Sequence, residues 1–184
     1  MNFTKYIRWA MPVLFVGIAL SQPTVAVLDF DANGVPDYEV ETLVERLRSE
    51  LPNTGAVRLV DRKMLENILK EQGLQQSGCT TDECAAQIGE LLGAQFMISG
   101  SIGKLEDTFT VDMKMVSVST GAAERARSIT FDGNVGGLLV EMQILAWEIV
   151  DKDVPKSLML QRAGTDDEKV TVAVMDFDPR GISL

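Results

Sequence analysis

The chain of 184 residues contains 27 acidic and 17 basic residues, carries a formal net charge of −10 and has no histidine. The excess of negative charge argues against nucleic acid or anionic lipid as the main partner, because both are bound by clustered Lys and Arg. The lack of histidine excludes Ser-His triads and His-ligated zinc within these residues. The proportions of hydrophobic (46%) and charged (24%) residues are those of a globular domain.

Residues 1–21 have the pattern of a secretory signal peptide. A basic start with Lys5 and Arg8 precedes an apolar run at 9–20, and small residues lie before Gln22. The run is shorter than the roughly 20 residues that span a bilayer, so an uncleaved anchor is the alternative. No Cys lies near the cleavage point to carry a lipid. We expect the mature chain in the periplasm or at the outer membrane, without a membrane span.

The first predicted elements are a buried strand that starts at Val25 and ends at 29–31, a turn at 33–36 and a helix capped near Asp37. Apolar residues recur at helical spacing and form the predicted inner side of this helix: Val40, Leu43, Val44, Leu47 and Leu51. Its charged residues are assigned to the opposite, solvent-facing side: Glu41, Glu45, Arg46 and Arg48.

A short strand at 57–60 is followed by two more predicted helices. Asp61 caps the first, which ends by Gly73 and has an apolar stripe of Met64, Leu65, Ile68 and Leu69. The second starts after Cys79 and closes at Gly93. Its predicted inner side contains Cys84, Ile88, Leu91 and Leu92.

Alternating apolar and polar residues then predict a hairpin of strands at 95–104 and 108–116, followed by a strand at 124–131. A long helix follows, with the apolar residues Val135, Leu138, Leu139, Met142, Leu145 and Ile149. The order β-α-β-α-α-β-β-β-α predicts an α/β fold, a mixed sheet of about five strands with helices packed on it. We assign 22–152 to this domain and the polar segment 153–169 to a linker. Met64, Met113, Met115 and Met142 are expected to pack in the core.

The chain contains an internal repeat. The sequence 24–36, which begins TVAVLDFD, returns as TVAVMDFD at 171–178 and continues to 183, at a constant offset of 147 (171 minus 24). Two copies of a domain-opening strand one domain length apart indicate a tandem arrangement. Residues 170–184 are therefore expected to start a second similar domain.

The two cysteines are expected to form a disulfide. If Thr80 is the N-cap, Thr80-Thr81-Asp82-Glu83 is a capping box, and Cys79 and Cys84 occupy the two positions that a hydrophobic staple brings together. The cysteine count is even and the exported setting is oxidising. Two buried free thiols or a redox-active pair are the alternatives.

No other motif predicts chemistry. The sequence 29–34, DFDANG, matches the opening of a calcium loop and Asp37 falls on its ninth position, but the twelfth position is Val40 instead of Glu. The carboxylates can instead lie at the end of a strand near a helix N-terminus. We expect no enzyme, no cofactor, and no catalytic, cofactor-binding or metal-binding residues.

Five segments together resemble the CsgG-like family, named for the curli production and transport component of the bacterial outer membrane: 25–30, 43–51, 59–62, 69–73 and 93–102. Cys79 and Cys84 resemble the cysteine pair of an exported subgroup. The resemblance implies a domain like the N-terminal domain of TolB, a type that binds other envelope proteins and often forms rings.

These observations predict a non-catalytic cell-envelope domain that binds envelope proteins or copies of itself and is related to curli secretion components. A subunit of an outer-membrane secretion pore is one alternative, although the strands 95–104 and 108–116 are needed for the core sheet. A calcium or small-ligand module at 29–37 is the other.

Overall fold

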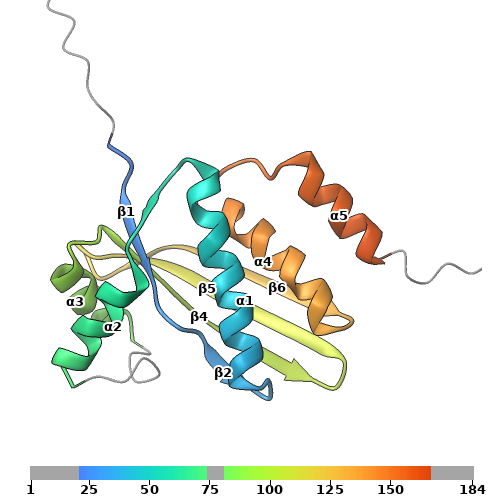
Figure 1. The fold of residues 1–184 in the computed structure, drawn as a ribbon, viewed down its shortest axis with the longest axis horizontal. Coiled ribbons are helices and arrows are strands. Elements are labelled where there is room, and N and C mark those ends of the chain that lie inside the picture. Colours follow the sequence, from blue (N-terminus) through green and yellow to red (C-terminus); the bar gives the residue numbers. More distant parts are fainter. Residues whose placement is uncertain (1–20, 74–80, 167–184) are drawn as a thin grey trace, which may run out of the picture.

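The computed structural model describes residues 21–73 and 81–166, which form one mixed sheet with helices on both faces (Figure 1). The first half contains β1 (Thr24–Val27), β2 (Asp31–Asn33), α1 (Asp37–Glu50), a 3-10 turn (Leu51–Thr54), β3 (Arg58–Leu59), α2 (Arg62–Glu71) and α3 (Asp82–Leu92). The second half contains β4 (Phe96–Leu105), β5 (Thr108–Ser117), β6 (Ala123–Asp132), α4 (Val135–Ile149) and α5 (Lys156–Asp166).

The sheet has the strand order β3-β1-β4-β5-β6, and β2 also pairs with β4. The pairs made by β1 and β2 are parallel, whereas β4, β5 and β6 form an antiparallel meander. This confirms the predicted α/β class with a mixed sheet. The sixth strand is β2, which starts at Asp31, where we expected the first strand to end, and includes Asn33, the first residue of the expected turn. It forms because β4 extends beyond the end of β1 and offers a partner there.

Alternation along the strands divides the core between the two faces of the sheet. Val25 and Val27 of β1 face α1 and α4, together with Ile98, Ile102, Phe109, Val111, Met113 and Met115. Ala26 and Leu28 face α2 and α3, together with Met97. The predicted inner side of α1 is buried as expected, and so are Met113, Met115 and Met142.

Helix boundaries follow local hydrogen bonding. Asp61 caps α2 as predicted, since its carboxylate accepts from the backbone amides of Lys63 and Met64. The expected cap of α3 is displaced by one residue: Thr81, not Thr80, accepts from the amide of Cys84. Gly93 closes α3 in the left-handed conformation that favours glycine.

Three side chains lie on the opposite side from the one predicted. Arg48, assigned to solvent, is only 5% exposed. Met64 and Leu91, assigned to the core, are 48% and 49% exposed. Met64 and Leu91 are exposed because α2 and α3 cover a small part of the sheet, so the buried stripe of each helix is narrower than its apolar stripe. Arg48 is buried because it lies on the inner stripe of α1 and pairs with Asp29.

The segment expected as a linker contains α5, which the polar composition did not indicate. It lies against α4, where Leu158 is buried and Arg162 Nε lies 2.8 Å from Glu141 Oε1. The predicted leader and the repeat at 170–184 lie outside the described residues. Within 21–73 and 81–166, no helix is long and apolar enough to cross a membrane.

Candidate functional site

One part of the sheet is left uncovered by the helices. We call it the open face: the side of β2, β4, β5 and β6 that points away from α1 and α4, beyond the area packed by α2 and α3. Alternation gives it almost exclusively small or polar residues, namely Asp31, Asn33, Ser99, Ser101, Gly103, Thr110, Asp112, Lys114, Ala126, Ser128 and Thr130. Its border with α3 is marked by an ion pair between Lys114 Nζ and Asp82 Oδ1.

A single row of four residues crosses the centre of the open face. Strand register aligns Asp31 with Ser101, Ser101 with Asp112, and Asp112 with Ser128. Ser128 Oγ donates to Asp112 Oδ1 over 2.5 Å. The row borders a shallow hollow of about 340 Å³, which is also lined by Asp29, Ser99 and Lys114. The open face thus presents carboxylate and hydroxyl oxygens to solvent around a depression.

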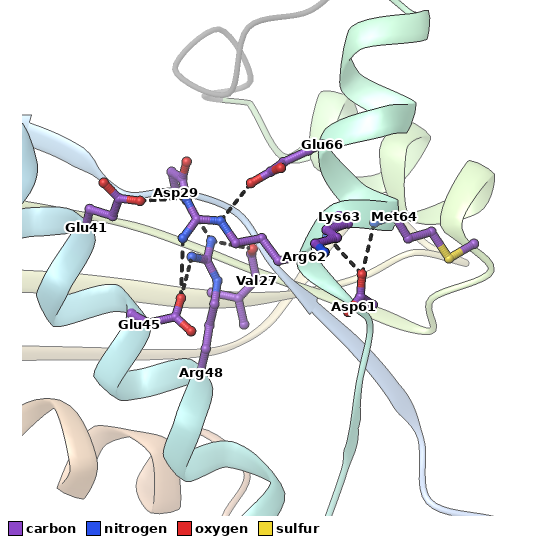
Figure 2. Close-up of polar contacts among 10 residues, drawn as sticks. All are labelled: Val27, Asp29, Glu41, Glu45, Arg48, Asp61, Arg62, Lys63, Met64 and Glu66. Carbon is purple, nitrogen blue, oxygen red and sulfur yellow. Dashed lines mark hydrogen bonds and ion pairs between the residues drawn. The ribbon is translucent and has the colours of Figure 1, made fainter.

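Next to this face, Asp29 and Arg48 form a partly buried ion pair (Figure 2). Arg48 Nη2 lies 2.6 Å from Asp29 Oδ1 and donates to the carbonyl oxygen of Val27 over 3.0 Å. Arg48 Nη1 also lies 3.4 Å from Glu45 Oε2. The pair joins α1 to the end of β1, so it fixes the backbone that leads into β2 and the row of Asp31.

Arg62, at the first position of α2, joins this helix to α1 (Figure 2). Its guanidinium contacts Glu41 at 2.8 Å, Glu66 at 2.8 Å and Glu45 at 3.4 Å. The hydrogen bond to Glu41, as the largest cause, raises the pKa of Arg62 above its ordinary value. These groups are about one-third to more than one-half exposed, so solvent screening keeps the contribution of the network to stability small.

The residues of the calcium-like pattern have separate structural roles. Asp29 pairs with Arg48, Asn33 lies in β2, and Asp37 is the first residue of α1. In the part of the chain that the structure describes, no three His, Cys, Asp or Glu side chains are grouped so that they could hold a metal ion.

The predicted disulfide joins Cys79 and Cys84. Cys84 lies in the first turn of α3, and Cys79 lies outside the described residues. The pairing therefore stays a prediction. The corrected cap at Thr81 places Cys84 at the third helical position instead of the fourth.

Sequence reasoning missed both Arg48 and the row across the open face. A signal for Arg48 was present, since it follows Val44 by one helical turn and precedes Leu51 by three residues, which puts it on the inner stripe. A cation on an apolar stripe requires a buried partner, and Asp29 at the end of the neighbouring strand is a suitable carboxylate. The row depends on strand register, which the sequence alone does not give.

The chain matches the family model described as peptidoglycan-synthase activator LpoB over residues 10–124, more than half of its length. No curated protein matches this chain in sequence. Because the matching family model is LpoB, the expected membership in the CsgG-like family, and with it the association with curli secretion, is wrong. The segments that carried it build parts of β1, α1, β3, both ends of α2 and β4, so they encode the framework of an α/β fold instead of a specific function. The alternative of an outer-membrane secretion pore depended on that resemblance and loses its support with it.

Solved structures agree on the fold. The C-terminal domain of LpoB from Salmonella enterica superposes with a TM-score of 0.50 at 23% identity, over 60% of this chain and 82% of that domain. Lipoprotein GNA1162 from Neisseria meningitidis gives a TM-score of 0.55 at 7% identity, over 83% of this chain and 99% of that protein. TolB from Acinetobacter baumannii gives a TM-score of only 0.46 at 13% identity, over 79% of this chain and 29% of TolB. This similarity is too weak to support the expected likeness to TolB.

These findings are consistent with the expectation, drawn from the sequence, of an envelope protein that acts by binding other proteins. The chain belongs to the LpoB family of peptidoglycan-synthase activators.

Proposed function

We propose that this protein activates a peptidoglycan synthase in the bacterial cell envelope by binding to it, without catalysing a reaction itself. The observation that carries the proposal is the family match over residues 10–124. The composition agrees, because a chain without histidine lacks the residue most often used for general acid-base catalysis. The open face adds a broad, polar surface of the kind found at the rims of non-obligate protein interfaces.

An exported chain fits this role. Peptidoglycan is polymerised outside the cytoplasmic membrane, and residues 1–21 have the pattern of a secretory signal. We propose that the mature chain works in the periplasm or at the outer membrane. Fractionation of cells that express the full chain tests this: we expect a shortened product in the envelope fraction, and an intact leader in the cytosol would contradict it.

Activation is tested with the chain lacking residues 1–21 and a purified peptidoglycan synthase from the same bacterium. The measurement is the rate of glycan polymerisation from a lipid-linked precursor. We expect the rate to rise with the concentration of the chain and then saturate, while the chain alone gives no product. An unchanged rate, together with no binding in solution, would rule out the proposed function.

We also infer that the repeat at 170–184 opens a second domain of this type. In the first copy Val25, Val27 and Phe30 are buried against α1 and α4, and the repeat has the same residue types at Val172, Val174 and Phe177. A strand with this pattern requires a sheet and a helix to cover it. Sequencing of the gene beyond codon 184 should find an apolar stripe spaced like that of α1, and its absence would remove the inference.

A further inference from the structure

The central row of the open face carries negative charge that the described residues do not neutralise. Asp31 and Asp112 are both exposed, and neither forms an ion pair within 21–73 and 81–166. The nearby charges are already paired, since Lys114 contacts Asp82 and Asp29 contacts Arg48. The central row therefore presents two carboxylates that lack a cation among the described residues, in a chain whose net charge is −10.

The spacing of these two carboxylates selects the kind of cation that fits. Asp31 and Asp112 are in register across Ser101, so their backbones are two strand spacings apart, about 10 Å. Two oxygens bound to one calcium ion lie within about 5 Å of each other, because each bond is about 2.3 to 2.6 Å. A guanidinium group donates on both sides through hydrogen bonds of about 2.8 Å, so it can bridge carboxylates on backbones this far apart, whereas one calcium ion would require the two side chains to converge.

The shape of the surface agrees with this chemistry. Between the two carboxylates the floor of the hollow is formed by small residues, including Ser99, Gly100 and Ser101, and its volume of about 340 Å³ leaves room for one long side chain. The Ser101 hydroxyl lies in the same row and can accept a further hydrogen bond. Arg48 already shows the same pairing on this protein, with Asp29 as its partner.

We propose that the open face binds an arginine-bearing segment of the synthase, with a guanidinium seated over Ser101 between Asp31 and Asp112. This inference rests on the proposed function and adds the surface and the chemistry of the contact. The binding is electrostatic in part, so its affinity falls as salt screens the charges.

The test compares the chain lacking residues 1–21 with its variant Asp31→Asn/Asp112→Asn, using the affinity of each for the purified synthase at several salt concentrations. Asparagine keeps the size of each side chain, and Ser128 can donate to the new amide oxygen, so the fold is preserved and circular dichroism verifies it. We expect the variant to bind at least about tenfold more weakly and to depend less on salt.

The matched control is Asp153→Asn/Glu90→Gln, which also removes two exposed carboxylates but lies away from the open face. The control should bind as the unmodified chain does. If the unmodified chain binds and activates the synthase and the open-face variant does so equally well, the proposed contact is wrong while the proposed function stands. If the unmodified chain neither binds nor activates, both fail. If the variant loses only self-association, measured by sedimentation, the occupant is a second copy and the synthase contact is overturned.

Discussion

Arg48 and Asp29 meet at the carboxyl end of β1, where Arg48 Nη2 lies 2.6 Å from Asp29 Oδ1 and 3.0 Å from the carbonyl oxygen of Val27. One guanidinium therefore serves both a carboxylate and a backbone carbonyl next to the sheet. Asp29 is 27% exposed, so water shares its solvation, whereas Arg48 is almost fully buried.

Replacement of Arg48 by Met should destabilise the domain. The variant leaves the Asp29 carboxylate and the Val27 carbonyl without this donor, and we expect a loss of about 2 to 3 kcal/mol in the free energy of unfolding. Urea denaturation followed by circular dichroism measures it. The matched control is Arg46→Met on the exposed side of the same helix, which should change stability by less than about 0.5 kcal/mol. Equal losses of stability in the two variants would mean that the Arg48–Asp29 ion pair does not contribute measurably to the free energy of unfolding.

Replacement of Arg62 by Gln should have a much smaller effect. Its three carboxylate partners are exposed by 47% to 58%, so water compensates for most of the lost contacts. We expect a loss of about 1 kcal/mol or less at low salt, and a smaller difference in 0.5 M NaCl, because salt already screens the network. A loss as large as that of Arg48→Met, insensitive to salt, would show that the network does more than join the two helices at the surface.

Glu50 should control the environment of the only tryptophan after the predicted leader. Trp147 Nε1 donates to Glu50 Oε1 over 2.9 Å, and Gln143 Nε2 donates to Glu50 Oε2 over 3.2 Å. Glu50→Ala removes both acceptors, so we expect Trp147 emission at longer wavelength and a loss of about 1 to 2 kcal/mol. Glu50→Gln retains one acceptor oxygen and should show less of both effects. Identical emission in all three proteins would contradict the expected role.

Cys79 and Cys84 should be linked in protein recovered from the envelope. Non-reducing peptide mapping should yield a single cross-linked peptide, and the closed loop is short enough that the bond adds only about 2 kcal/mol by the chain-entropy model. Cys84 lies two residues after Asp82, whose carboxylate contacts Lys114 on the open face. The double variant Cys79→Ser/Cys84→Ser should therefore raise hydrogen exchange at the start of α3 before it affects α1. Free thiols in exported protein would refute the pairing.

The periodicity of the sequence was enough to predict most of the elements, because β1, β4, β5 and α1 each have an apolar side that must be covered. It failed where the structure depends on a contact between distant segments. The strand β2 exists only because β4 continues past β1, and Met64 and Leu91 are exposed because α2 and α3 cover little of the sheet. Strand register, which creates the row from Asp31 to Ser128, is another such contact.

The position of β1 has a consequence for how the chain is made. It is the first strand of the sequence, yet it lies between β3 and β4, whose residues follow it by more than 30 and 70 positions. If the chain is exported from its N-terminus, as proposed above, the apolar side of β1 stays uncovered until Phe96 has crossed the membrane and the sheet can close around it. Newly exported chains would then carry an unpaired strand during this interval, which would make them clients for chaperones and targets for proteases.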